Sequence, residues 1–282
     1  MARRTVLAAG VLAVGGGALA ACTDAPTSPA TGGPAAASTS DPSAAPAPAA
    51  STPPTTGTTS PASSSSSGPS TTAPPSILTT PGADIASGPT TPAAVALTFH
   101  GAGSLSLTAA VLDIARSAGA HLTVFAVGQW LAANPGVGRD IVTAGHDLGN
   151  HTWSHQEMTT LSAAAARREI EQGDGAVAAA VGQAGVLFRP SGTPTSTATI
   201  RAAAAAFGYS RCISYDVDSL DYTDPGAAAV QSRTLDGVKA GSIVSLHLGH
   251  QGTVDALPGI LKGLADKGLT AVTLTRLLAG AA

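Results

Sequence analysis

The sequence predicts an α/β domain over residues 91–282, built from parallel strands joined by helices. Short apolar runs alternate along this stretch with alanine-rich segments, a pattern typical of a parallel sheet with helical crossovers. A stretch of this length can bury one good core but is too short for two ordinary domains with linkers. Glycines mark the predicted passages from helix to strand, as C-cap residues do: Gly119, Gly145, Gly208 and Gly268.

The individual elements follow from hydrophobic patterning. Each predicted strand is a short run of apolar and β-branched residues, whereas each predicted helix is a longer alanine-rich segment. Alternation over 213–218 predicts a strand that carries its carboxylates towards one end, where barrel enzymes place active sites. Strands are expected at 94–99, 122–127, 213–218, 241–246 and 269–274, and helices at 105–118 and 163–181.

The N-terminal segment predicts export and lipid attachment. Arg3 and Arg4 precede an apolar run over 6–20, and Leu-Ala-Ala then leads into Cys22. The run is too short and too rich in Gly and Ala for a good membrane span, so residues 1–21 are expected to be a cleaved signal peptide. The arrangement resembles a bacterial lipoprotein signal, which implies an extracytoplasmic protein lipid-anchored to the cell membrane through Cys22. Twin-arginine and ordinary export both remain open.

Composition separates a tether from the folded domain and excludes one class of partner. Residues 22–90 consist almost wholly of Ala, Pro, Ser, Thr and Gly and contain no aromatic residue. Such a segment cannot bury enough apolar surface to fold, so a disordered linker is expected. The chain has a formal net charge of −3, and it shows no basic patch, phosphate-binding loop or dinucleotide fingerprint. No nucleic acid is therefore expected among the partners.

The strongest chemical signal is the pair His151 and His155, which follows a Gly-Asn turn. On a helical turn, positions i and i+4 lie on one face about 5–6 Å apart, so both imidazoles can converge on one ion. The spacing alone is only a moderate signal, because two unrelated histidines can share it. Further motifs in a fixed order strengthen the interpretation of the pair as metal ligands.

The order of these motifs resembles the polysaccharide deacetylase family, also called NodB-homology or carbohydrate esterase family 4 domains. The resemblance spans residues 92 to 278 and implies a distorted (β/α) barrel that hydrolyses N- or O-acetyl groups on sugars with a divalent metal. The motifs that carry it are LTFHG at 97–101, HTWSH at 151–155, FRP at 188–190, YDVDSLDY at 215–222 and SLH at 245–247.

The first motif departs from the family pattern, because His100 and Gly101 stand where the family has two aspartates, the catalytic base and a metal ligand. Three interpretations follow. His100 could replace the missing ligand beside His151 and His155. It could instead act as the base, with a carboxylate such as Asp147 or Glu157 recruited to the metal. In the third interpretation catalysis is lost, and the cleft only binds glycan.

Zinc is the expected metal if His100, His151 and His155 form one site. Three neutral imidazoles with an open fourth position suit zinc, and such a site can bring bound water to a pKa of about 7. Hydroxide would then form without a strong carboxylate base. Gly101 and Gly103 bracket Ala102 and are expected to let the backbone bend enough for an imidazole to fit.

The later motifs imply roles by the same resemblance. The family pairs the arginine at position 189 with the catalytic aspartate, so Arg189 lacks its usual partner here. His247 is the expected general acid, and Asp218 is expected to orient it and keep it protonated. Asp216 is expected to cap the strand end. Substrate contacts are expected from Tyr222 and Leu246, which would line the acetyl pocket, and from Trp153.

The sequence therefore predicts a lipid-anchored, metal-dependent hydrolase that removes acetyl groups from cell-envelope polysaccharide through an altered, histidine-rich site. The alternative is a catalytically inactive, deacetylase-like lipoprotein that binds cell-wall glycan. The expected partner is envelope polysaccharide, the expected contact with membrane is the lipid anchor alone, and the chain is expected to be a monomer. Structural roles are expected for His121, His146 and Cys212, whereas His250, beyond Gly249, is expected to be an exposed loop residue.

Overall fold

A computed structural model describes residues 82–282 of the chain. The predicted signal peptide, the lipid site at Cys22 and the linker up to residue 81 lie outside the described residues. Within 82–282, no helix is both long and apolar enough to cross a membrane.

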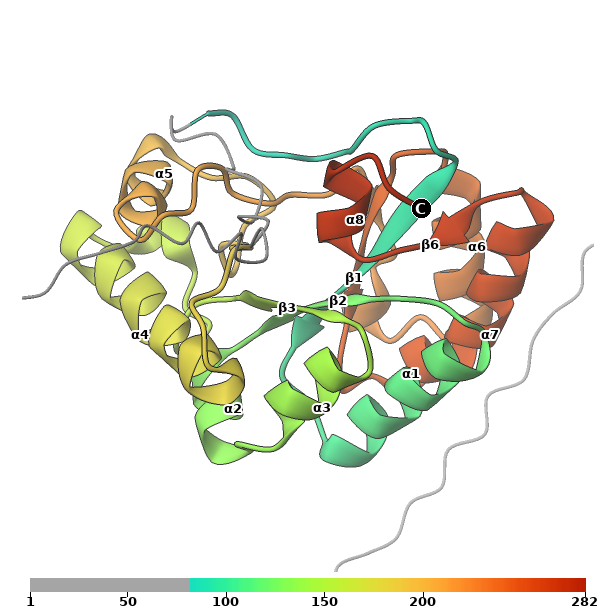
Figure 1. Cartoon of the computed structure of the whole chain (residues 1–282), viewed down its shortest axis with the longest axis horizontal. Coiled ribbons are helices and arrows are strands. Elements are labelled where there is room, and N and C mark those ends of the chain that lie inside the picture. The colour runs from blue at the N-terminus through green and yellow to red at the C-terminus, as the bar shows by residue number, and fades with distance from the viewer. Residues whose placement is uncertain (1–81) are drawn as a thin grey trace, which may run out of the picture. The chain divides into compact units, whose positions relative to one another are not determined.

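The described part is an α/β domain in which every named strand pair is parallel (Figure 1). The sheet order is β3-β2-β1-β5-β4, and β6 pairs with the start of β1. The strands are β1 (Ala94–Gly101), β2 (Thr123–Ala126), β3 (Asp147–Asn150), β4 (Val217–Asp218), β5 (Ile243–His247) and β6 (Thr270–Ala271). The helices are α1 (Leu105–Ser117), α2 (Gly128–Ala133), α3 (Val137–Thr143), α4 (Ala163–Val181), α5 (Ala198–Ala205), α6 (Ala227–Gly237), α7 (Gln251–Asp266) and α8 (Leu274–Leu278).

Irregular bridges close this sheet into a distorted barrel. Asn150 at the end of β3 pairs with Phe188, and the amide of Ile213 donates to the carbonyl of Phe188 at 2.8 Å. The chain from Ile213 then continues into β4, which pairs with β5. The fold expected from the sequence is therefore confirmed, with two sides of the ring made of single bridges instead of full strands.

The core has layers on both faces of the strands because side chains alternate along β1. Val95, Leu97 and Phe99 pack outwards in a cluster with α1 and α7, whereas Ala94 and Ala96 face the barrel interior. A third cluster joins α4 and α5 around Phe188. Figure 1 shows β1 through the centre of the domain, with α1, α6 and α7 on one side and α4 and α5 on the other.

The predicted boundaries hold best where the pattern is long and regular. The helix predicted at 163–181 coincides with α4, and the four predicted C-cap glycines all have positive φ. The strand predicted at 213–218 is wrong in extent, because only Val217 and Asp218 form regular ladder pairs there. Of the last predicted strand, 269–274, only Thr270 and Ala271 form β6.

The domain also begins earlier than residue 91. Ile85 bridges to Ile213, and its amide donates to the carbonyl of Cys212 at 2.9 Å. Asp84 accepts a hydrogen bond from the hydroxyl of Ser196 at 2.7 Å. Residues 82–90, assigned to the linker by composition, are thus part of the folded domain.

Candidate active site

Five of the seven histidines gather at the carboxyl ends of the parallel strands. Their rings follow one another in a row, with centroid separations of 4.9, 4.7, 4.4 and 6.1 Å from one end to the other. β1 and β5 contribute the central rings, since His100 and His247 are register partners on these neighbouring strands. In order, the row is His155, His151, His100, His247 and His250.

A buried asparagine positions His151 at the end of β3. Asn150 donates from Nδ2 to the carbonyl of Ile170 at 2.9 Å, and its Oδ1 accepts from the amide of Thr152 at 2.8 Å. Thr152 takes a φ of 68°, so the chain turns sharply directly after His151. His151 Nδ1 lies 2.9 Å from the carbonyl oxygen of Arg189, which can only accept. The proton is therefore on Nδ1, and the lone pair of Nε2 points into the site.

His155 reaches the site through a loop, so the expectation of a helical turn is wrong. Glu169 on α4 accepts from the amides of Trp153 and Ser154 at 3.1 and 2.8 Å, which holds the loop against that helix. His155 itself has a φ of 59°, a conformation outside the right-handed helix. The two imidazoles nevertheless converge, with centroids 4.9 Å apart.

His100 contacts three polar groups at the end of β1. Its Nδ1 lies 3.2 Å from Nε2 of His151. Its Nε2 lies 3.0 Å from Nη1 of Arg189 and 3.2 Å from the hydroxyl of Ser245. The ring is thus held on both edges.

Arg189 is a buried cation, with 1% of its surface exposed. Its Nη1 donates to Thr98 Oγ1 at 2.8 Å and its Nη2 to the carbonyl of Ser214 at 2.9 Å, while the guanidinium stacks on Phe125 at 4.4 Å. No carboxylate within the described residues forms an ion pair with it. Burial lowers the pKa of Arg189 to about 9, although Tyr215 and Asp218 act in the opposite direction.

The same burial keeps the central imidazoles neutral. Burial lowers the pKa of His100 well below its ordinary value, and the neighbouring His151 and Arg189 lower it further. Burial likewise lowers the pKa of His151 well below its ordinary value, with His155 adding to the effect. A neutral imidazole is the form that binds a metal ion.

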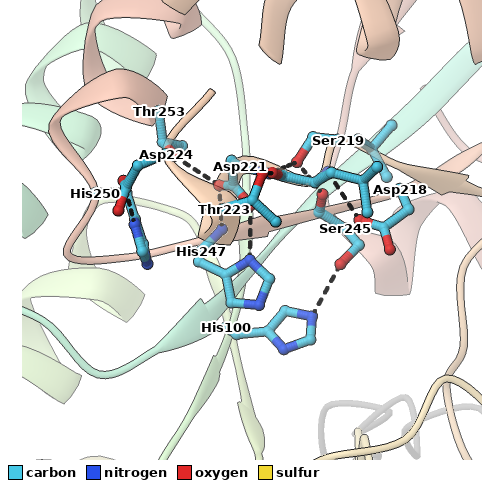
Figure 2. Close-up of polar contacts among 12 residues, drawn as sticks. His100, Asp218, Ser219, Asp221, Thr223, Asp224, Ser245, His247, His250 and Thr253 are labelled. Atoms are coloured by element: carbon cyan, nitrogen blue, oxygen red, sulfur yellow. Dashed lines mark hydrogen bonds and ion pairs between the residues drawn. The ribbon is translucent and has the colours of Figure 1, made fainter. Parts of the chain in front are cut away.

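On the β5 side, His247 is paired with a buried carboxylate (Figure 2). His247 Nδ1 and Asp221 Oδ1 lie 2.7 Å apart, and Asp221 Oδ2 accepts from the amide of His247 at 2.7 Å and from the hydroxyl of Thr253 at 2.6 Å. Burial alone would raise the pKa of Asp221, but hydrogen bonds from His247 and Thr253 hold it below its ordinary value. The pair suits an imidazole that must hold and release a proton.

The prediction that Asp218 orients His247 is therefore wrong. Asp218 Oδ1 instead accepts from the amide of Leu220, two residues along the chain, at 3.0 Å. Leu220 has a φ of 53°, and this left-handed turn carries the chain back so that Asp221 meets His247. Asp216 caps the opposite end of β5, where its Oδ1 accepts from the amide of Ile243 at 2.8 Å.

The predicted substrate residues lie in three different environments. Leu246 is wrong as a pocket residue, because it is fully buried in the outer cluster, on the face of β5 opposite to His247. Tyr222 is 50% exposed, and its ring centroid is 5.2 Å from that of His247. Trp153 packs over Gly128 at the rim. Substrate contact by Tyr222 and Trp153 stays a prediction.

His250 is less exposed than its loop position suggested. It begins α7, its side chain is 26% exposed, and its Nδ1 pairs with Asp224 at 2.8 Å. Figure 2 shows this second imidazole–carboxylate pair beside the first. Asp224 itself is 71% exposed, so solvent screens this pair far more than the buried Asp221.

The three-histidine zinc site does not fit this arrangement. His151 offers a lone pair and His155 lies beside it, but the group at 3.0 Å from His100 Nε2 is a guanidinium nitrogen, which only donates. His100 therefore carries its proton on Nδ1, the atom that faces His151. No cluster of three or more His, Cys, Asp or Glu side chains within 82–282 has metal-site geometry.

The two carboxylates considered as alternative ligands are also misplaced. Asp147 opens β3 at the other end of the sheet, where it accepts from the amide of Thr275 at 2.8 Å. Glu157 is exposed and accepts from the hydroxyl of Thr159 at 2.6 Å. Gly101 and Gly103 permit close packing rather than a bend, since an added Cβ would meet the backbones of Ala126 and Gly249.

A parallel barrel with imidazoles and a histidine–aspartate pair at the carboxyl ends of its strands is typical of α/β enzymes that use acid–base groups. Comparisons with known proteins give the family. The polysaccharide deacetylase family profile matches residues 87–212. A peptidoglycan-N-acetylglucosamine deacetylase of Bacillus cereus is 31% identical over 188 residues, which cover 65% of this chain and 87% of that protein. The chain belongs to the polysaccharide deacetylase family.

Similar solved structures include a carbohydrate esterase and a pseudoenzyme of the same family. A family 4 carbohydrate esterase from Streptomyces lividans, in complex with acetate, is 34% identical with a TM-score of 0.59, covering 64% of this chain and 92% of that one. A carbohydrate esterase family 4 pseudoenzyme from Bacillus anthracis is 26% identical with a TM-score of 0.65, covering 69% and 68%. A mutant of this pseudoenzyme is described as having restored enzymatic activity.

The sequence did not predict several residues that the structure places at the site. Asp221 was inside a recognised motif but was passed over in favour of Asp218. Ser245 and Thr98, which share a face with His247 and His100, contact the site through their hydroxyls. Glu169 holds the His155 loop from α4. A polar residue two positions before the histidine of β1 and of β5 was the available signal.

Proposed function

We propose that this domain hydrolyses acetyl groups, N- or O-linked, on cell-envelope polysaccharide. The observation that carries the proposal is the buried Asp221–His247 pair at the carboxyl end of β5, in a chain of this family. The relatives named above include a peptidoglycan-N-acetylglucosamine deacetylase, so an N-acetylated wall glycan is the first substrate to test.

The contact with Asp221 supports His247 as the proton donor. Its Nδ1 is held by Asp221, which leaves Nε2 free to give a proton to the departing amine or alcohol. The carboxylate stabilises the imidazolium before transfer, and it also fixes the ring in one orientation. Tyr222, half exposed and 5.2 Å from His247 between ring centroids, offers an aromatic surface for a sugar ring.

A divalent metal, with zinc as the expected ion, is part of this proposal. His151 and His155 are the candidate ligands, and His100 is not counted among them. In hydrolases a bound metal polarises the acyl oxygen and lowers the pKa of a bound water. The proposal also places the protein outside the cell, lipid-anchored at Cys22, with the domain as a monomer.

One observation favours a second function, binding of glycan without hydrolysis. The position next to His151 is filled by an imidazole held by a buried guanidinium, and among residues 82–282 no carboxylate stands there to act as base.

The test measures acetate released from N-acetylated chito-oligosaccharides, peptidoglycan and acetylated xylan, with added zinc and with chelator. Release that depends on metal and on His247 supports the hydrolase. Absence of acetate from all three substrates rejects it. Glycan affinity that is unchanged by chelator and by His151→Ala would then support the binding protein.

A further inference from the structure

The contacts of His100 fix the position of its proton. Guanidinium groups carry only donors, so the Nη1 of Arg189, 3.0 Å away, requires a lone pair on Nε2 of His100. A neutral imidazole has one proton, which must then sit on Nδ1. Arg189 cannot easily withdraw, because Thr98, the carbonyl of Ser214 and the ring of Phe125 hold it on its other sides.

His151 has the complementary arrangement. Its Nδ1 faces the carbonyl oxygen of Arg189 at 2.9 Å, so this nitrogen carries the proton and Nε2 is the acceptor. The 3.2 Å between His100 Nδ1 and His151 Nε2 therefore holds one proton, which belongs to His100. Arg189 determines both tautomers, one through its side chain and the other through its backbone.

The distance alone does not distinguish a hydrogen bond from a shared metal. Two nitrogens bound at about 2.0–2.1 Å to a tetrahedral zinc ion lie roughly 3.3 Å apart, close to the 3.2 Å between these rings. The proton does distinguish them. For His100 to bind the ion, its proton would have to move to Nε2, against the guanidinium 3.0 Å away.

We infer that His100 is an internal competitor of the metal: locked by Arg189, its Nδ1–H caps the lone pair of His151 that a divalent ion would need. Metal binding to His151 is thus weakened by competition from His100, and removing the His100 ring strengthens it. The inference concerns metal binding, and its bearing on catalysis rests on the hydrolase proposed above.

The direct test is the tautomer. Two-bond ¹H–¹⁵N correlation spectra of the metal-free full chain at pH 7.5 should show His100 and His151 both protonated on Nδ1. A proton on Nε2 of His100 would overturn the inference. This measurement uses the wild-type chain, so it does not depend on whether a variant folds.

The second test is zinc affinity, measured by calorimetric titration of the full chain in detergent after dialysis against EDTA. His100→Ala should bind zinc about tenfold more tightly than wild type, the change expected when one competing hydrogen bond is removed. His121→Ala is the matched control, because this ring lies at the opposite end of the sheet, where its Nδ1 meets the carbonyl of Gly145. The zinc affinity of this variant should equal that of wild type.

Weaker or unchanged zinc binding in His100→Ala would overturn the inference, since either result contradicts competition. The outcome is separable from the proposed function. Tighter zinc binding without acetate release would leave the inference standing and reject the hydrolase. Acetate release by the wild type together with loss of zinc binding in His100→Ala would support the hydrolase and reject the inference.

Discussion

The active site has two halves, and each stabilises its buried charged group in a different way. In the carboxylate half, made of Asp221, His247 and Thr253, the imidazole pairs with an anion that is itself held by two further donors. In the imidazole half, made of His100, His151 and Arg189, the partners of a buried guanidinium in the described part of the chain are neutral acceptors.

The difference shows where the chain departs from its family. His100 and Gly101 stand where the resemblance to the family implies two aspartates, so the imidazole half lacks that negative charge, whereas the carboxylate half is complete. A buried cation that loses its anion needs other partners, and here it takes the lone pair of His100. We therefore expect proton transfer and metal binding to be separable in this site, so that each can be perturbed alone.

The largest effect is expected from Asp221→Asn in the carboxylate half. An amide cannot stabilise the His247 imidazolium, so acetate release should fall by about 10²–10⁴-fold in kcat/KM. Asp224→Asn is the matched control, because it alters the neighbouring His250 pair on the exposed rim and should change the rate little. An equal fall in both variants, or no fall in Asp221→Asn, would contradict the assignment of the general acid.

The next prediction concerns the packing of α4 against Asn150 and the turn after His151, which positions the imidazole half. A Cβ at Gly173 on α4 would collide with the side chain of Asn150 and the carbonyl carbon of Thr152, which shape the turn after His151. Gly173→Ala should therefore lower the free energy of unfolding by about 1–3 kcal/mol, as measured by urea denaturation. Gly175→Ala, two residues along the same helix and with nothing within 4 Å, should instead raise it by about 0.5–1 kcal/mol.

Opposite signs in this pair would support close packing of α4 against Asn150 as the reason for glycine at position 173. Similar effects of the two substitutions would mean that helix propensity alone decides the result, and that the turn after His151 tolerates displacement of Asn150.

The two halves should also lose stability at different pH values. The folded-state pKa of His100 is lowered, so unfolded chains take up a proton below a pH of about 6.5 while the folded chain does not, and stability falls there. His100→Gln should therefore lose less stability than wild type between pH 7 and pH 5, by about 1 kcal/mol or more. Urea denaturation at each pH gives the comparison.

The pKa of Asp221 is also lowered in the folded state, but the consequence appears at lower pH. Its stabilisation is complete above the unfolded value of about 3.9 and disappears as the pH falls through the folded value. The difference between wild type and Asp221→Asn should persist from pH 7 to pH 5 and shrink below pH 4. Loss of that difference near pH 6 would contradict the assigned hydrogen bonds.

Sequence patterning predicted the framework that carries both halves. β1, α4 and the strand before His247 are long or strongly apolar, so their periodicity identifies them without tertiary information. The convergence of His151 and His155 was also predicted, although for the wrong local reason. A loop held by Glu169, not a helical turn, brings the rings together.

The acid partner could not be predicted because its position depends on an irregular turn. Alternation in 213–218 favours Asp218, but the chain leaves the strand there and turns back through Leu220 at positive φ. Hydrophobic periodicity does not predict the positive φ of Leu220. The hydrogen bond from Arg189 to His100 could not be predicted either, because it depends on Arg189 reaching across the barrel interior to Thr98 and the carbonyl of Ser214.

The smallest effect is expected from Ser245→Ala, which sharpens the comparison within the imidazole half. The hydroxyl of Ser245 is 3.2 Å from His100 Nε2, farther than the guanidinium nitrogen at 3.0 Å. If Arg189 fixes the tautomer, removing the hydroxyl should cost less than about 1 kcal/mol of unfolding free energy and leave the His100 proton on Nδ1. A larger loss, or movement of that proton to Nε2 in the ¹⁵N spectrum, would mean that Ser245 orients His100, and the guanidinium would then be an insufficient lock.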